Sequence, residues 1–248
     1  MPRGPEQGGG VVHAHLVVFR GMEDEEGGIQ GSHMFQQGLS GGQPASQQKQ
    51  LEDDVRRALE TLEQEGVPVD LTRVAVVGHS LGGEQALVYA ASAAAAGLPI
   101  PTAVMSIVPG PCRSGEDTCL GVDLGAIPGT TRILLVAEEA GTDAAARIWA
   151  ELGAVPLENR DVVRLVTDGH GKPGLGASHI QALANDIVFR PDALDWYGTW
   201  KWLDALMSCA FAGEWCEVAL GNTPEQRFMG VWSDGVPVTE AVVTDEPD

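Results

Sequence analysis

The sequence predicts an α/β protein with a mostly parallel sheet flanked by helices. Short apolar runs rich in β-branched residues alternate along the chain with longer segments of helical periodicity. Each run is apolar throughout rather than at every second position, which is typical of strands covered on both faces. With 44% hydrophobic residues among 248, the chain can bury a sizeable core.

The strands follow from the apolar runs. They are expected at 15–19, 73–77, 103–108, 132–137 and 162–166. Helices are expected at 47–65, 82–96, 143–152, 178–187 and from about Pro191 through Met207. Gly66 and Pro68 end the first helix, and Gly97 and Pro99 end the second, because both residue types break helices.

The first helix and the last one show which faces should be buried. The first carries apolar residues at helical spacing: Leu51, Val55, Leu59 and Leu62. The last contains four aromatic residues: Trp196, Tyr197, Trp200 and Trp202. Trp196, Trp200 and Leu203 recur at helical spacing, so we expect this face to pack on the sheet.

The N-terminal part differs in composition from the rest. Residues 21–50 are rich in Gly, Gln and Ser, which indicates loop or disorder. We therefore expect a poorly ordered segment with one strand at 1–50 and the main domain at 51–248. No internal repeat is present.

Charge and hydropathy exclude some partners. Thirty-five Asp and Glu against fifteen Lys and Arg give a formal net charge of −20, which disfavours binding to nucleic acid. No apolar run approaches the roughly 20 residues of a membrane span. The N-terminus does not resemble a signal peptide, which favours a cytoplasmic location.

The four cysteines form two local pairs, Cys112 with Cys119 and Cys209 with Cys216. Their spacing does not match the common zinc signatures, so no metal site is expected. Two alternatives stay open: four reduced thiols, or two short-loop disulfides formed in an oxidising compartment. Disulfides would therefore favour a secreted protein over a cytoplasmic one.

Ser80 lies in the segment Gly78-His79-Ser80-Leu81-Gly82, between an expected strand and an expected helix. This Gly-x-Ser-x-Gly pattern is typical of a nucleophile elbow, a sharp turn that bulky neighbours would obstruct. The strand before it and the helix after it favour a nucleophile over a structural serine. The Leu81 N–H, at the start of the helix, would then face a developing oxyanion.

A serine nucleophile needs a base and an acid that follow it in the order Ser, Asp/Glu, His. His170 and His179 both follow the strand at 162–166 in the segment DGHGKPGLGASH, and either could serve. For the acid, Glu139 is the first choice and Glu138 the second, since both follow the strand at 132–137. Asp143 is better explained as a helix N-cap.

GHSLGG, followed by a small-residue helix, resembles the α/β-hydrolase superfamily. GASH resembles the segment around the catalytic histidine of cutinase-like and polyester-hydrolase-like members. Motifs from AVMSIVPG to ALGNTPEQRFMGVWSDGVPV resemble an uncharacterised bacterial group related to those enzymes and to chlorophyllase-like and dienelactone-hydrolase-like proteins. The resemblance covers roughly residue 67 to the C-terminus. It implies Ser80 as nucleophile and His179 as base, with His170 as runner-up.

The chain departs from the family pattern in two places that bear on catalysis. The opening strand that ends in His-Gly and supplies a second oxyanion donor is missing, so the first strands of the fold are expected to be absent. The Asp-rich acid loop is replaced by EEAGTD. We expect a serine hydrolase of small-molecule carboxylic esters that needs no cofactor. The alternatives are a catalytically impaired binding domain and a lyase or thioesterase on the same fold.

Overall fold

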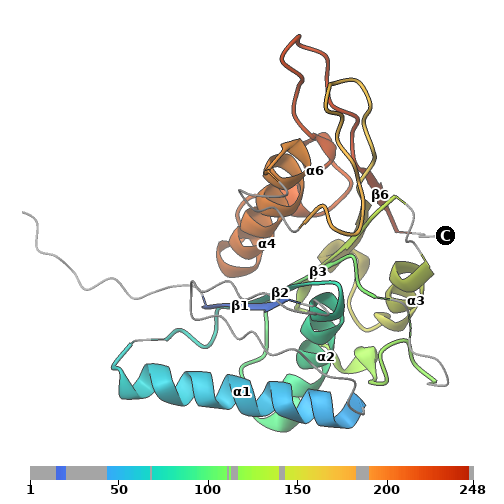
Figure 1. Cartoon of the computed structure of the whole chain (residues 1–248). Helices are drawn as coiled ribbons and strands as arrows, with labels where there is room; N and C mark the ends of the chain where they lie inside the picture. Colours follow the sequence, from blue (N-terminus) through green and yellow to red (C-terminus); the bar gives the residue numbers. More distant parts are fainter. Residues whose placement is uncertain are drawn as a thin grey trace, which may run out of the picture.

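The computed structural model describes residues 15–20, 44–67, 69–110, 112, 117–139, 143–182 and 190–245. These residues contain a six-stranded sheet in the order β1-β2-β3-β4-β5-β6, with helices on both faces (Figure 1). The strands are β1 (His15–Arg20), β2 (Val74–His79), β3 (Ala103–Ile107), β4 (Arg132–Ala137), β5 (Arg160–Arg164) and β6 (Val242–Thr244). Strands β1 to β5 run parallel and β6 runs antiparallel to β5. The predicted α/β fold with a mostly parallel sheet is therefore confirmed.

The helices form one layer on each side of the sheet. Helices α1 (Pro44–Gln64), α2 (Leu81–Ala96) and α3 (Asp143–Glu151) lie on one side, and α4 (Lys201–Ala212) lies on the other (Figure 1). The short helices α5 (Cys216–Ala219) and α6 (Pro224–Arg227) follow α4. Parallel crossovers are almost always right-handed, so crossovers that all advance in one direction place their helices on one face. That rule explains why α1, α2 and α3 share a side.

Alternate residues of the strands contribute to two separate cores. In β2, Val74 and Val76 join the core under α1, α2 and α3, whereas Ala75 and Val77 join the core under α4. The residues of β4 divide in the same way: odd-numbered positions join the first core and even-numbered positions join the second. Burial on both faces explains why the strand sequences are apolar at every position.

Helix α2 is apolar on nearly all sides because it lies between the sheet and α1. More than half of its buried residues are alanine or glycine, which lets the neighbouring elements approach closely. Leu51 and Val55 of α1 belong to the same core cluster. The Tyr89 hydroxyl, buried within α2, donates to the carbonyl of Pro99, 2.8 Å away. Burial raises the pKa of Tyr89 to about 12.

Several elements differ from those expected. Helix α1 begins at Pro44, so it includes residues assigned to the poorly ordered segment, and the expected boundary at residue 50 falls inside it. Strand β5 begins and ends two residues earlier than expected. Strand β6 was not predicted, because a three-residue strand has too little pattern to recognise. Of the helix expected at 178–187, residues 178–182 form turns and 183–187 lie outside the described residues.

The prediction that Trp196 and Trp200 pack on the sheet was wrong. Trp202 is completely buried, whereas Trp196 and Trp200 are 58% and 39% exposed and contact each other edge to face. The reason is that the segment before α4 is a π-helix, Asp195–Trp200. A π-helix bonds residue i to i+5 and so shifts the register of the faces. Gly198 faces inward there, where a Cβ atom would lie 3.2 Å from Met229 and 3.3 Å from Leu165.

The cysteines are paired as disulfides, Cys112 with Cys119 and Cys209 with Cys216. The first pair lies in the connection between β3 and β4, and the second joins α4 to α5. Cys119 and Cys209 are buried. Of the two alternatives that the sequence left open, the structure therefore has the disulfides.

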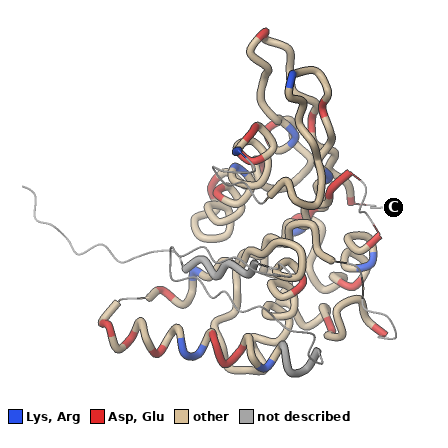
Figure 2. Tube along the Cα trace, viewed as in Figure 1, with Lys and Arg blue, Asp and Glu red and all other residues tan. Residues whose placement is uncertain are grey.

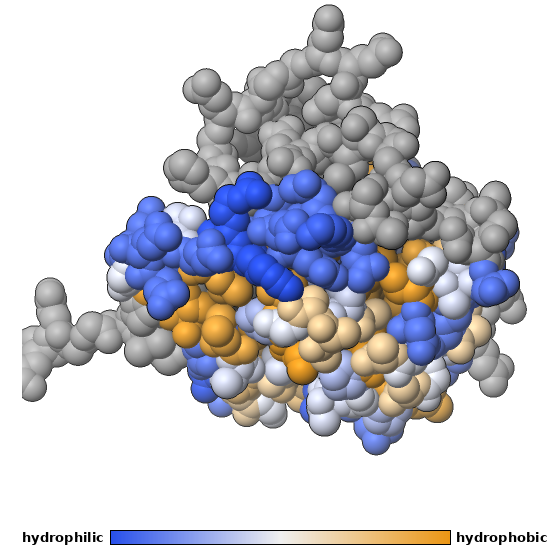
Figure 3. Space-filling model, turned by 90° about the horizontal axis from the view of Figure 1, so that it is seen from below, coloured by the Kyte–Doolittle hydropathy of each residue, from blue (hydrophilic) through white to orange (hydrophobic). Residues whose placement is uncertain are grey.

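Acidic residues are distributed along all parts of the described chain rather than gathered in one segment (Figure 2). The face of the molecule that is seen from below, on the side of α1, has hydrophilic and apolar residues side by side (Figure 3). Among the helices that the structure describes, none combines the length and apolar character required to cross a membrane.

Alanine substitutions at Trp202 and Trp200 should distinguish a buried aromatic residue from an exposed one by their effects on stability. Trp202→Ala removes a fully buried side chain whose indole N–H donates to the carbonyl of Gln226, so we expect a loss of about 3–5 kcal/mol of unfolding free energy. Trp200→Ala, the matched exposed position, should cost less than about 1 kcal/mol. Urea denaturation followed by far-UV circular dichroism measures both. Equal losses would contradict the assignment of the buried face.

Candidate active site

Ser80 occupies the turn between β2 and α2 with an unusual backbone conformation. Its φ is 56° and its ψ is −126°, a region that residues with a side chain rarely adopt. The turn is tight: a Cβ atom on Gly78 would lie 2.0 Å from the carbonyl oxygen of Gly82. Only glycine fits at position 78, which accounts for the glycine in the sequence pattern. The Ser80 N–H donates to the carbonyl of Ile107 at the end of β3, 2.9 Å away.

Leu81, the expected oxyanion donor, is the first residue of α2 and directly follows Ser80. The first N–H groups of a helix have no carbonyl within the helix to bind, and they carry the positive end of the helix dipole. The N–H groups of Gly83 and Glu84 already donate to the Ser80 carbonyl. The N–H of Leu81 therefore lies in a favourable electrostatic position for an anion beside Ser80.

The structure brings His179 to Ser80. The Nε2 atom of His179 lies 2.9 Å from the Ser80 hydroxyl oxygen. His79, the last residue of β2, also contacts this histidine: its Nε2 atom lies 2.6 Å from the His179 carbonyl oxygen. The two rings stand 5.0 Å apart. The residue before Ser80 therefore holds the backbone of His179, a contact that the sequence pattern did not reveal.

Of the two candidate acids, the one that faces His179 is Glu138 rather than the preferred Glu139. An oxygen of Glu138 lies 3.6 Å from His179 Nδ1, a distance suited to an ion pair with a protonated imidazole. Successive residues after a strand point in different directions, and Glu138 and Glu139 are neighbours in chain order. Which of the two lies nearer His179 depends on the path of the chain after β4. Asp143, expected as an N-cap, is instead the first residue within α3.

Glu139 fastens the loop that carries the histidine. One of its carboxylate oxygens accepts the Thr167 N–H at 3.2 Å, and its own N–H lies 3.5 Å from the Ala177 carbonyl. The Thr167 hydroxyl accepts the Ala177 N–H at 3.2 Å. Hydrogen bonds from the Thr167 side chain and backbone lower the pKa of Glu139. Glu139 is thus linked to the residue two positions before His179.

Asp168 organises the glycine-rich loop between β5 and His179. Its side chain accepts the N–H of His170, the indole N–H of Trp232, and both the N–H and the hydroxyl of Thr239. The backbone of Asp168 pairs with Leu175, which closes the loop on itself. The hydrogen bonds from His170 and Thr239 lower the pKa of Asp168 to about 2. The loop is therefore held by one buried carboxylate, despite its glycine content.

His170, the alternative base, makes a different set of contacts. Its Nε2 atom lies 2.8 Å from an Asp234 carboxylate oxygen, and its ring lies 5.7 Å from that of Trp232. The structure therefore places His170 against the segment that follows α6, whereas His179 contacts Ser80. Because both histidines follow β5 within one loop, the sequence could not separate them by position alone.

No family model matches this chain, and no curated protein sequence matches it significantly. Within the described residues there is also no cluster of three or more His, Cys, Asp or Glu side chains arranged to hold a metal ion. The arrangement of the site is thus the main observation that bears on function. It offers a hydroxyl next to an imidazole, a carboxylate beyond it, and a helix N-terminus alongside.

Replacing Asp168 should loosen the loop that carries the histidine. Asp168→Ala leaves four donors without their acceptor, so we expect a loss of about 2 kcal/mol or more of unfolding free energy. Because the folded-state pKa lies below the usual value of 3.8, the wild-type carboxylate stabilises the fold above pH 3.8. That contribution should disappear as the pH falls through about 2.

The pH dependence of thermal unfolding, with hydrogen exchange at the Leu175 N–H, measures this effect. Asp234→Ala is the matched control, because Asp234 is exposed and bonds the same loop only through the His170 ring. A loss of stability and protection in Asp234→Ala as large as in Asp168→Ala would contradict the central role of Asp168.

Proposed function

We propose that this protein is a serine hydrolase of the α/β-hydrolase type that cleaves carboxylic esters by acyl transfer. The observation that carries the proposal is the 2.9 Å contact between Ser80 Oγ and His179 Nε2, at a strained turn between a strand and a helix. A nucleophile and base within hydrogen-bond reach, with a carboxylate on the far side of the base, match the requirements of this chemistry. The resemblance of GHSLGG and GASH to α/β-hydrolases and cutinase-like enzymes supports it.

In the proposed reaction, His179 Nε2 takes the proton of the Ser80 hydroxyl as Oγ attacks the ester carbonyl carbon. The carbonyl oxygen becomes an oxyanion, which the Leu81 N–H and the dipole of α2 stabilise. The imidazolium gives its proton to the departing alcohol, and an acyl group remains on Ser80. Water, deprotonated by the same histidine, then releases the acid. Glu138 stabilises the imidazolium in both halves of the reaction.

The surroundings of the proposed triad suit this role. The His179 side chain is 43% exposed, so a substrate can reach it, whereas Glu138 is only 19% exposed. A carboxylate partly removed from water interacts more strongly with a positive charge on the ring. The two disulfides support a protein that acts in an oxidising compartment, such as the cell exterior.

Labelling with a fluorophosphonate probe tests the proposal directly. We expect the intact protein to be labelled and Ser80→Ala not to be, because the probe reacts only with an activated serine. His179→Ala should lower p-nitrophenyl butyrate turnover about as far as Ser80→Ala, since residues of one catalytic unit are strongly non-additive. His170→Ala, the matched control, should retain most of the activity. An intact protein that is neither labelled nor active would favour the alternative of a binding domain without catalysis.

A pair of isosteric variants tests which carboxylate serves the histidine. Glu138→Gln should lower turnover about tenfold or more, because it removes the charge facing the imidazolium. Glu139→Gln should have a much smaller effect, since the amide oxygen of Gln can still accept the Thr167 N–H. Steady-state kinetics of both variants, with circular dichroism to check folding, provides the measurement. A larger loss for Glu139→Gln would reverse the assignment.

A further inference from the structure

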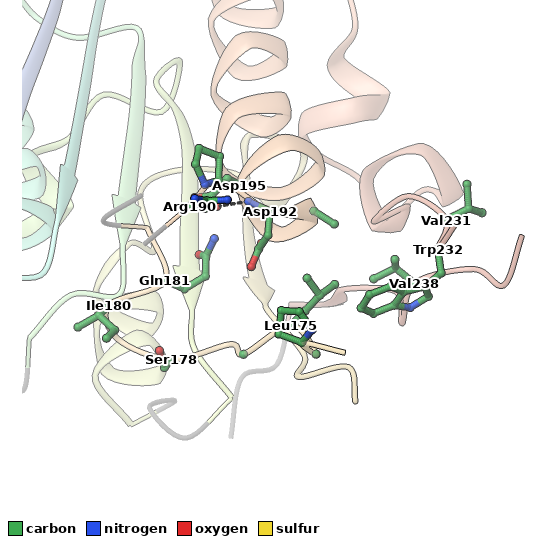
Figure 4. A pocket seen from close by; sticks show the side chains of 15 residues that line it. Leu175, Ser178, Ile180, Gln181, Arg190, Asp192, Asp195, Val231, Trp232 and Val238 are labelled. Atoms are coloured by element: carbon green, nitrogen blue, oxygen red, sulfur yellow. Dashed lines mark hydrogen bonds between the residues drawn. The ribbon is translucent and has the colours of Figure 1, made fainter. Parts of the chain in front are cut away.

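A cavity of about 700 Å³ lies next to the histidine loop and contains polar groups that the proposed triad does not use (Figure 4). It is formed by three segments, one around 173–181, one around 190–195 and one around 231–238. Ser178 and Ile180, on either side of His179, both line it. Most of its other lining residues are apolar, and they include Trp232. The cavity can therefore hold a small organic molecule.

Asp195, in the wall of this cavity, is buried, and only one of its two carboxylate oxygens has a hydrogen-bond partner. The residue is 2% exposed. One carboxylate oxygen accepts the N–H of Asp192 at 2.9 Å, which is a structural role at the start of the π-helix. The other oxygen is buried without a hydrogen-bond partner. Among the described residues, no Lys, Arg or His forms an ion pair with Asp195.

A buried carboxylate oxygen without a partner is costly, so it points to a group that is supplied from outside. Burial raises the pKa of Asp195, which reflects the same loss of solvation. The amide nitrogen of Gln181, in the wall of the same cavity, is also buried and has no acceptor. Two residues of the cavity wall thus carry a buried acceptor and a buried donor that the protein leaves unused.

We propose that this cavity binds a small molecule with a protonated amine, an oxygen acceptor and an apolar body. The amine would donate to the free oxygen of Asp195, the acceptor would bind the amide of Gln181, and the apolar body would pack on Trp232 and Leu175. The charge of the surroundings favours a cation: Asp192 also lines the cavity, and the chain carries a formal charge of −20. Arg190 is the opposing charge of the lining, but its side chain is exposed.

This site is distinct from the Ser80 site and does not rest on the proposed hydrolase activity. Neither Ser80 nor His179 lines the cavity, although the neighbours of His179 do. Binding can therefore be measured without any turnover, and its presence or absence leaves the proposed function untouched.

Titration calorimetry at pH 6.0, where the α-amine of phenylalaninamide is protonated, compares this amide with 3-phenylpropanamide and tests the proposal. The two probes share a phenyl ring and a carboxamide, and only the first carries an ammonium group. We expect saturable binding of phenylalaninamide, and at least tenfold weaker binding of 3-phenylpropanamide. Equal affinities, tighter binding of the neutral probe, or no binding of phenylalaninamide at millimolar concentration would overturn the proposal.

Variants locate the site. Asp195→Asn should weaken phenylalaninamide binding at least tenfold while still accepting the Asp192 N–H, so the fold should persist. Gln181→Leu should weaken it several-fold. Asp204→Asn is the matched control, because it removes one carboxylate from an exposed position of α4 that does not line the cavity, and it should bind as the wild type does. Unchanged affinity in Asp195→Asn, in a variant whose melting temperature shows it folded, would exclude this cavity as the site.

Discussion

The close approach of β2 and α2 is the constraint on which the candidate site depends. A Cβ atom at Gly78 would lie 2.0 Å from the Gly82 carbonyl oxygen, so the chain can turn this sharply only with glycine there. The turn holds Ser80 in a strained conformation directly before the first turn of α2. The bond from the Ser80 N–H to Ile107 ties the turn to the next strand. Strain at this one residue is thus balanced by the sheet and by the helix.

The remaining site residues reach Ser80 because parallel strands end at one edge of the sheet. Glu138 follows β4 and His179 belongs to the long loop after β5, and both come from this edge. His79 and Glu139 then limit the freedom of the histidine loop, one through the His179 carbonyl and the other through Thr167. Elements far apart in the chain are brought together by topology and fixed by a few hydrogen bonds.

Local patterns were sufficient to predict most of the fold, because the strands are buried on both faces and the helices are bounded by glycine and proline. The Gly-x-Ser-x-Gly segment also predicted the turn at Ser80, since the requirement for glycine there is local. The choice between Glu138 and Glu139 depended on the direction of a loop, which no spacing encodes. The buried face of the last helix was mispredicted because one π-helical turn displaces the register from Trp200 to Trp202. Asp168 went unrecognised, since its partners Trp232 and Thr239 lie more than sixty positions away.

The antiparallel pairing of β6 with β5 determines which part of the chain can vary without changing the sheet. The chain leaves the sheet after Arg164 and returns at Val242, and these two residues are paired partners in adjacent strands. Everything between them, including the histidine loop, α4 and the amine-binding cavity proposed above, enters and leaves at the same edge. This segment can therefore be lengthened, shortened or replaced without altering the order of the strands. The walls of the proposed cavity can therefore change without any change in the glycine turn at Ser80.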